Sequence, residues 1–102
     1  MQTKFSIGQI VHHKLFDYRG VIIDVDGCFQ GSEQWYEQVA NSRPPKDQPW
    51  YHVLVDNATH QTYVAERNLE ASDILTPIDH PAIDFVFCGM REGHYLQRLK
   101  SN

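Results

Sequence analysis

Short segments rich in β-branched and aromatic residues, each followed by turn-forming residues, recur along the first two thirds of the chain. In the segment 21–26, odd-numbered positions carry β-branched side chains, while Asp24 and Asp26 share the opposite face, because side chains alternate along a strand. The segment 50–55, WYHVLV, is apolar almost throughout, which predicts a central strand buried on both faces. These patterns predict a mainly β protein.

The rest of the chain predicts further short elements. Ser32 is placed to cap a helix that cannot extend far, because residues 43–49 contain three prolines. Turn-forming residues after Val55 predict that the next apolar segment returns as a hairpin. We expect strands within 5–13, 62–65 and 74–78, a single helical turn at 66–69, and helices at 33–40 and at 81–87, the last stopped by Gly89.

Closely spaced short strands with one tight helical turn before the last favour a small antiparallel β-barrel with short helical excursions. Closing the sheet would remove exposed strand edges, which otherwise promote aggregation. We expect one domain over residues 1–102, since this length suits a single core. The predicted core consists of Val21, Ile23, Val25, Tyr51, Val53, Val55, Tyr63 and Leu69.

Charge is distributed unevenly along the sequence. The formal net charge is −4, so the surface as a whole does not attract polyanions, and any contact with DNA must be local. Residues 1–20 and the last fifteen residues each carry a net charge of +2, which leaves −8 on the part between them. The two basic ends either meet as a modest cationic patch or remain separate, solvated termini.

Compartment and redox state are also indicated by the sequence. The chain starts without a signal-peptide pattern and contains no apolar run that would span a bilayer, so we expect a cytoplasmic protein without membrane contact. In a reducing cytosol, Cys28 and Cys88 are expected to be free and mostly buried thiols, with a single disulfide as the alternative.

Signatures of catalysis are missing from the sequence. It has no nucleophile elbow, P-loop, zinc-protease motif or dinucleotide-binding glycine pattern, so we expect neither enzyme activity nor a cofactor. A metal site is not expected either. His12 and His13 point to opposite faces of a strand, and the paired carboxylates of Asp24 and Asp26 are interpreted as solvated surface rather than as ligands of a hard cation.

Aromatic residues on both sides of the proline-rich segment are the better indication of function. Trp50 and Tyr51 are expected in the core. Trp35 and Tyr36 are the better candidates to face a ligand, because a short helix can cover only one of its sides. Exposed aromatic rings stack on bases, pack around methyl groups or receive apolar peptides.

Three stretches carry a resemblance to a known family. KFSIGQIVHHKLFDYRGVIIDVD at 4–26, PWYHVLVD at 49–56 and TYVAERNLE at 62–70 resemble the HspQ family, also called YccV-like or hemimethylated-DNA-binding domain proteins. The elements occur in the family's order, with a variable excursion before PWY. After Glu70 the chain departs from the familiar form of the family.

The resemblance implies an SH3-like or tudor-like barrel in a bacterial heat-shock protein that is not an enzyme. It also implies two different functions. One is binding of hemimethylated DNA near replication origins, with an effect on the level of the replication initiator. The alternative is a role as accessory specificity factor and substrate of the Lon protease, through protein contacts. The sequence leaves open whether the chain forms a homo-oligomer.

For contact with DNA, basic and aromatic side chains are expected to have different roles. Lys14 and Arg19 are expected to neutralise phosphates, and an aromatic residue such as Trp35 is expected to sense an adenine methyl group. The full candidate set is His12, His13, Lys14, Arg19, Trp35 and Arg91, with Arg98 and Lys100 beside Arg91. For a protease role, the excursion at 31–48 and the basic tail at 97–102 are the expected contact segments.

Overall fold

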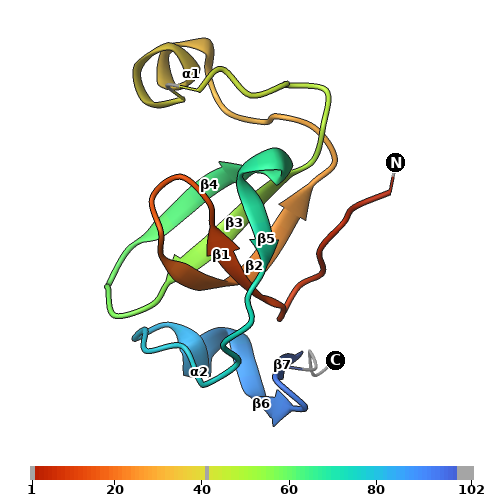
Figure 1. Ribbon diagram of the computed structural model, residues 1–102, viewed down its shortest axis with the longest axis vertical. Helices are drawn as coiled ribbons and strands as arrows, with labels where there is room; N and C mark the ends of the chain where they lie inside the picture. The colour runs from red at the N-terminus through yellow and green to blue at the C-terminus, as the bar shows by residue number, and fades with distance from the viewer. Residues whose placement is uncertain (1, 41, 99–102) are drawn as a thin grey trace.

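A five-stranded antiparallel sheet and a separate two-stranded hairpin make up the β structure (Figure 1). The computed structural model describes residues 2–40 and 42–98. The sheet has the strand order β4-β3-β2-β1-β5, and β6 pairs with β7. The elements are β1 (Ile10–His13), β2 (Arg19–Asp26), α1 (Glu33–Val39), β3 (Trp50–Val55), β4 (Gln61–Ala65), η1 (Glu66–Asn68), β5 (Leu69–Ala71), α2 (Ile83–Val86), β6 (Phe87–Arg91) and β7 (His94–Gln97).

The prediction of a mainly antiparallel β fold is confirmed, but the sheet is not closed into a barrel. In the described part of the chain, β4 and β5 are the two edge strands, joined by the single turn of η1. The turn at η1 and the hairpin formed by β3 and β4 lie where the sequence predicts them. β2 rather than β3 is the central strand, although β3 is paired on both sides.

A β-bulge in β2 changes which side chains reach the core. The register between β2 and β3 shifts between Ile22 and Asp24, so that Ile23 is the extra residue. As a result, Val25 packs on the same face as Ile22, whereas Ile23 stays with Val21 on the other face, and Val21 and Ile22 are themselves completely buried. Strict alternation across 21–26 was therefore the wrong expectation. Of the predicted core, Ile23, Val25 and Tyr63 are only half-buried, whereas the other five residues are buried.

The core consists of three clusters, two of which lie on opposite faces of the sheet. One lies on one face of the sheet and contains Phe5, Val11, Ile22, Tyr51, Val53, Val64 and Leu69. The second joins the sheet to the C-terminal elements and contains Ile10, Val21, Leu54, Ile78, Phe87 and Tyr95. The third packs α1 against β3 and β4 through Tyr36, Trp50 and Ala65. The sheet is thus covered at both ends, as Figure 1 shows.

Helix α1 forms as predicted, and the proline-rich segment is tied to it. The side-chain oxygen of Ser32 accepts a hydrogen bond from the Trp35 backbone N–H at 3.1 Å, which is the expected N-cap. The Tyr36 hydroxyl donates to the carbonyl oxygen of Pro44 at 2.7 Å, and the indole N–H of Trp50 donates to that of Pro45 at 3.0 Å. These bonds give the excursion a defined path beside the sheet.

The C-terminal third differs most from the prediction. No strand forms at 74–78; β5 begins earlier, at Leu69, where it pairs with β1. The predicted helix at 81–87 is reduced to α2, and Gly89 lies inside β6 instead of stopping a helix. The reason is the hairpin turn at Glu92 and Gly93, both with positive φ, which returns the chain so that Tyr95 packs on Phe87.

Two further expectations concern the cysteines and membranes. Cys28 and Cys88 are free thiols, but both are exposed, so the expectation of burial was wrong. Cys28 lies in the loop between β2 and α1, and Cys88 lies in β6 of the two-stranded hairpin. Within residues 2–40 and 42–98, no helix combines the length and the apolar character needed to cross a membrane.

Candidate functional site

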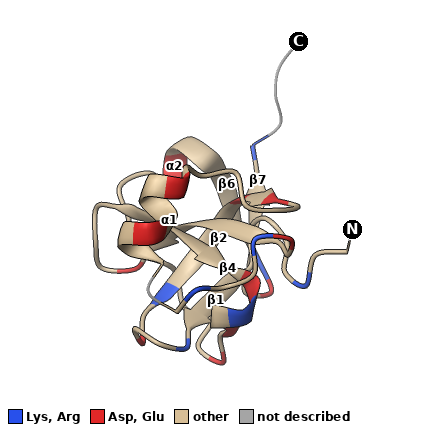
Figure 2. Ribbon diagram, turned by 90° about the horizontal axis from the view of Figure 1, so that it is seen from above, with Lys and Arg blue, Asp and Glu red and all other residues tan. Residues whose placement is uncertain are grey.

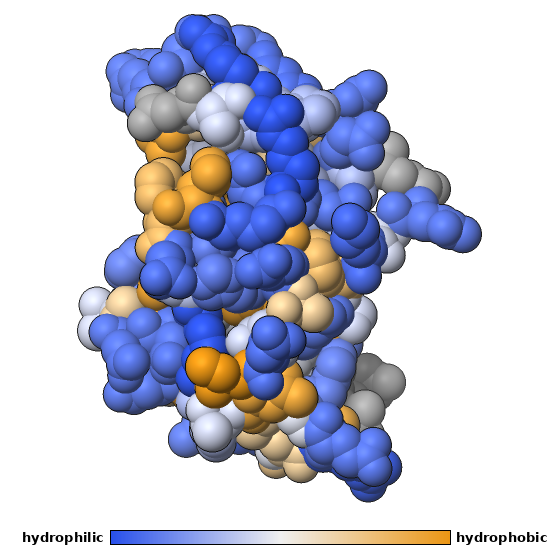
Figure 3. Space-filling model, viewed as in Figure 1, coloured by the Kyte–Doolittle hydropathy of each residue, from blue (hydrophilic) through white to orange (hydrophobic). Residues whose placement is uncertain are grey.

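A largely apolar groove of about 750 Å³ lies between α1, the β1–β2 loop and strand β4. Figure 3 shows apolar side chains gathered on this side of the molecule, below α1. The most exposed of them, Leu15, Phe16 and Val39, stand at its mouth. Its lining is completed by His13, Tyr18, Trp35, Ala40, Ser42, Pro44, Trp50, His52, Gln61, Thr62, Tyr63, Val64, Ala65 and Asn68.

Histidine 13 holds the β1–β2 loop in place as one wall of the groove. Its Nδ1 accepts hydrogen bonds from the backbone N–H groups of Leu15 and Phe16, both at 3.1 Å. Its ring also stacks on Phe16, with 4.7 Å between centroids. Burial and the neighbouring His12 lower the pKa of His13, which keeps the ring neutral and able to accept. His13 is therefore a positioning residue for Leu15 and Phe16.

Histidine 12 is held on the other side of β1 by two carboxylates. Its Nε2 lies 2.6 Å from Asp17 Oδ1, and its Nδ1 lies 2.8 Å from Glu70 Oε2. The hydrogen bonds to Asp17 and Glu70 raise the pKa of His12 above its ordinary value, because both favour the doubly protonated ring. Since Asp17 belongs to the β1–β2 loop and Glu70 to β5, the His12 ring joins these two segments.

The opposite wall of the groove is aromatic and comes from α1. The Trp35 ring packs edge-on against Tyr63 and Trp50, with centroid separations of 5.8 and 6.1 Å. Val39, one turn later on the same helix, continues this wall. Tyr36 is instead buried toward the proline-rich segment. Of the two aromatic residues predicted to face a ligand, only Trp35 lines the groove.

Strand β4 and its neighbours form the floor, where a small polar network sits beside the aromatic rings. The Tyr63 hydroxyl donates to Asp26 Oδ2 at 2.6 Å, and burial together with this bond raises the pKa of Tyr63. His52 Nε2 lies 3.2 Å from the same oxygen. Asp24, Asp26 and His52 bring their ligand-type atoms within 4.8 Å of one another. Cross-strand hydrogen bonding to Asp26 accounts for this cluster, and we assign it no metal ion.

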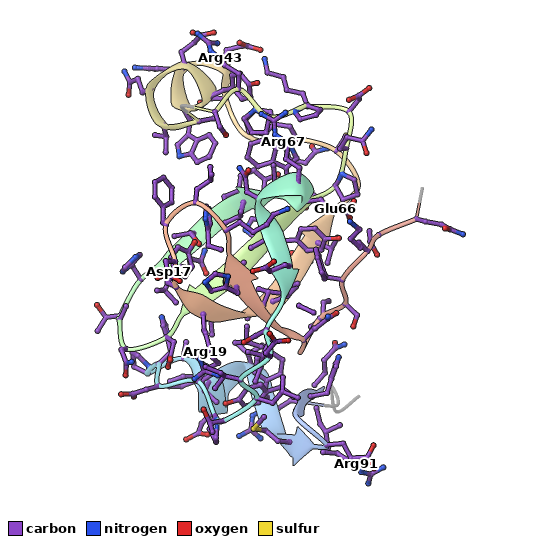
Figure 4. The ribbon with its side chains drawn as sticks, in the orientation of Figure 1. Asp17, Arg19, Arg43, Glu66, Arg67 and Arg91 are labelled. Carbon is purple, nitrogen blue, oxygen red and sulfur yellow. The ribbon has the colours of Figure 1, made fainter. Side chains whose placement is uncertain are left out.

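Among residues 2–40 and 42–98, no Lys, Arg, Asp or Glu lines the groove, and cations stand at its rim. Lys14 directly precedes the exposed Leu15 and is itself exposed. The Arg67 guanidinium donates to the carbonyl oxygen of Ser42, and Arg43 forms an ion pair with Glu37 at 2.9 Å. Figure 4 shows Arg43 and Arg67 at the α1 end of the molecule. Figure 2 shows acidic residues on both α1 and α2, so the basic residues do not form one extended face.

The structure brings together some of the predicted DNA-contacting residues and separates others. His13 and Trp35 line the groove, and Lys14 stands beside it. Arg19 is instead mostly buried in an ion pair with Asp56, away from the groove. Figure 4 places Arg91 at the opposite end of the molecule from Arg43 and Arg67, so Arg91 does not share the rim of the groove with them.

Sequence reasoning missed most of the groove. The exposed pair Leu15 and Phe16 was the available signal, because two large apolar residues inside a polar turn are unusual unless they cover or bind something. The contribution of β4 was not foreseeable from its sequence. It depends on α1 folding back over the sheet, which leaves the edge of the strand inside a cavity.

Comparison with known families adds an independent result. The model of the family described as "Hemimethylated DNA-binding protein YccV like" matches residues 3–94. The chain belongs to the YccV-like family. The match includes every strand of the main sheet and continues through β6, so it extends past Glu70, where the sequence seemed to depart. It supports DNA as a partner, and the family is defined by DNA binding rather than by a catalysed reaction.

Proposed function

We propose that this YccV-like protein recognises hemimethylated DNA without catalysing a reaction, through the groove and its rim. The observation that carries the proposal is the position of two aromatic side chains, the exposed Phe16 and the half-buried Trp35, on two walls of an uncharged groove beside the exposed Lys14. An uncharged aromatic surface suits a methyl group or a base, whereas an adjacent cation suits a phosphate. The family match supports the choice of DNA as ligand.

The roles of the residues differ within this proposal. Lys14 contacts a phosphate, and Trp35 packs on the methyl group, which lies at the major-groove edge of the adenine. His12 and His13 act indirectly by holding the loop that carries Lys14, Leu15 and Phe16. Arg19 supports the fold, and Arg91 lies too far from the groove to share its ligand site.

The net charge of −4 sets the expected strength of binding. With few cations at the rim, the protein neutralises only a few phosphates, so affinity is modest and falls with salt by about 0.9 logarithmic units per contact and decade. Discrimination between methylation states then depends on the groove and not on the phosphates, because phosphates carry no information about methylation.

The test is a fluorescence-anisotropy titration with matched hemimethylated, fully methylated and unmethylated duplexes at several salt concentrations. Lys14→Ala should weaken binding to all three and lower the salt slope by about 0.9. Trp35→Ala should reduce the preference for the hemimethylated duplex while leaving the salt slope unchanged. Arg91→Ala is the matched control for loss of one exposed charge. Undetectable binding to every duplex at low salt would overturn the proposal.

The cellular role follows from the family resemblance. We propose that the protein acts in the bacterial cytoplasm during heat stress and that binding near replication origins changes the level of the replication initiator. Measuring that level in cells with and without Lys14→Ala links the role to DNA binding. An unchanged initiator level in cells lacking the protein would contradict it.

A second candidate function is the accessory role with the Lon protease. One observation favours it: Phe85, Ile74 and Leu75 are exposed at the C-terminal end, far from the groove, which suits contact with another protein. Of the predicted tail contact, residues 99–102 lie outside the described residues. A reconstituted degradation assay with the full chain and with Phe85→Ser tests this role. No effect of the full chain on its own or any client's degradation would exclude it.

A further inference from the structure

Strand β4 is an edge strand, and no other strand of the described residues pairs with its outer side. It pairs with β3 alone, from Gln61 opposite Leu54 to Ala65 opposite Trp50. An unpaired strand edge presents backbone donors and acceptors in a row and readily accepts another extended chain. What β4 can bind depends on which of its backbone N–H and C=O groups point outward and on the side chains around them.

The register identifies the outward groups. The Val55 N–H donates to the His60 carbonyl oxygen at 3.3 Å, and the Glu66 N–H donates to that of Pro49 at 3.0 Å. Hydrogen-bonded and non-hydrogen-bonded pairs alternate along an antiparallel ladder, so Thr62 and Val64 point their backbone groups toward β3. The intervening residues, Gln61, Tyr63 and Ala65, point theirs outward. Among the residues that the structure describes, the backbone groups of Gln61 and Tyr63 and the Ala65 N–H have no hydrogen-bond partner, whereas the Ala65 carbonyl oxygen belongs to the N-cap of η1.

The groove runs along this outer edge of β4. All five residues of β4 line it, although successive side chains of a strand point to opposite faces. A cavity that contacts both faces of a strand must run along its edge. The β1–β2 loop lies on one side, fixed by a hydrogen bond of 2.7 Å between the hydroxyls of Tyr18 and Thr62. Trp35 packs on Tyr63 on the other side.

We propose that the groove binds an extended, uncharged peptide segment of a partner protein, which adds to β4 as a further strand. The peptide backbone would pair with Gln61, Tyr63 and Ala65. Its side chains would alternate between the wall formed by Leu15 and Phe16 and the wall formed by Trp35 and Val39. Because both walls are apolar, about three consecutive residues of the peptide must be apolar, so that the side chains directed to either wall are apolar.

Charge and position favour a peptide over the other occupants. Among the described residues, no acidic or basic side chain lines the groove, which matches an uncharged segment, and a phosphate would instead stay at the rim beside Lys14. The outward N–H and C=O groups require a partner with the spacing of an extended backbone, about 4.8 Å from β4. Figure 1 places the described N-terminal segment and β7 away from β4, so these segments of the chain do not fill the groove. The proposal goes beyond DNA binding and does not depend on it.

The experiment uses the full chain and a panel of capped, fluorescein-labelled heptapeptides, of which Gly-Thr-Val-Leu-Val-Thr-Gly is the parent, with Ile and Phe replacements at its three central positions. We expect binding that is insensitive to salt and unchanged by Lys14→Ala, in contrast to binding of DNA. Hydrogen exchange followed by NMR should show new protection at the amides of Gln61, Tyr63 and Ala65. The amides of Thr62 and Val64, which already face β3, are internal controls.

Two sets of variants test the geometry. Phe16→Ala removes an exposed wall residue without affecting the core and should weaken peptide binding about tenfold, whereas Phe85→Ala, at a more exposed but distant position, should not change it. Two N-methylated peptides are compared, one modified at the central Leu and the other at both flanking Val residues. Since alternate amides of the bound peptide face β4, one of these peptides should lose binding and the other should keep it.

Three results would overturn the proposal. The first is the absence of any change at the outward amides with every peptide up to 1 mM, a concentration at which weak complexes are visible (on the order of 1 mM in Kd corresponds to about 4 kcal/mol). The second is equal loss of binding for both N-methylated peptides. The third is a concentration-dependent dimer in sedimentation with these amides protected in the free protein, which would assign the edge to a second copy of the chain.

Discussion

The guanidinium group of Arg19 forms an ion pair with the carboxylate of Asp56, with 3.0 Å between Nη2 and Oδ2, and both side chains are largely buried. Arg19 also donates from Nη1 to the backbone carbonyl oxygens of Ile74 and Thr76, each at 2.9 Å. Asp56 in turn accepts from the Asp79 N–H at 2.7 Å. This pair thus fixes the segment that leads from the sheet to the C-terminal elements.

We therefore expect Arg19→Ala to lower the free energy of unfolding by about 2 to 3 kcal/mol, because Asp56 and two carbonyl groups lose their donor. Arg19→Lys should recover only part of it, since an ammonium group cannot reproduce the fork of donors. Urea denaturation measures both. Lys14→Ala, an exposed basic residue nearby in sequence, serves as control and should change the midpoint little; an Arg19→Ala midpoint equal to it would contradict the structural role.

His12 and His13 predict opposite dependences of stability on pH. The pKa of His12 is raised in the folded protein by Asp17 and Glu70. Its contribution to stability is therefore complete below its ordinary pKa of about 6.5 and is lost as the pH rises through the raised pKa. The difference in unfolding free energy between the wild-type protein and His12→Gln, measured by urea denaturation, should be larger at pH 5.5 than at pH 8.5. A difference that grows with pH would contradict this.

The pKa of His13 is lowered, and its neutral ring accepts two backbone hydrogen bonds. Its contribution is present above about pH 6.5 and is lost as the pH falls through the lowered pKa. In acid, we expect the Leu15 and Phe16 amides to lose protection from hydrogen exchange before the amides of the sheet do. NMR-detected exchange between pH 7 and pH 4.5 follows this. Simultaneous loss in loop and sheet would show that His13 does not control the loop.

Part of this fold follows from sequence, and the missing part has physical reasons. The hairpin of β3 and β4 and the Ser32 cap depend on neighbouring residues, so local patterns predict them. The bulge at Ile23 does not, because it depends on packing of both faces of β2, where Val25 joins the cluster of Ile22 and Ile23 that of Val21. The C-terminal hairpin was hidden because Phe87 and Tyr95 carry contacts with the sheet rather than a periodic pattern of their own.

In the candidate site, too, some features follow from local sequence and others depend on tertiary packing. Trp35 was predictable, since a short capped helix leaves one aromatic side uncovered. Arg19 was predicted at a DNA interface from its charge alone, whereas its position depends on Asp56, 37 residues away in sequence. An ion pair of that separation leaves no local signal. The unpaired edge of β4 was likewise invisible, because strand order is a property of the whole sheet.

Gly20 in β2 provides a test of packing between β2 and β3. A Cβ atom at this position would lie 2.4 Å from Val53 Cγ1 and 2.6 Å from the Leu54 carbonyl oxygen. Gly20→Ala should therefore destabilise the protein by about 1 to 3 kcal/mol, as overpacking of a core does. Shortening the side chain with Val53→Ala removes one clash but leaves the backbone oxygen in place, so the double variant should not regain wild-type stability. Full recovery in thermal denaturation would refute this close approach.

Tyr95 provides the last test, because it joins the β6–β7 hairpin to the rest of the molecule. Its ring is buried against Phe87, and its hydroxyl oxygen accepts a hydrogen bond from the buried Ile78 N–H at 2.8 Å. Tyr95→Phe keeps the ring but leaves that N–H without a partner, which costs about 1 to 2 kcal/mol. Tyr95→Ala also removes the ring and should cost about 3 to 5 kcal/mol. Chemical denaturation of both variants separates the two contributions. Equal midpoints for Tyr95→Phe and wild type would mean that water replaces the hydroxyl, and the hairpin would then be held by apolar packing alone.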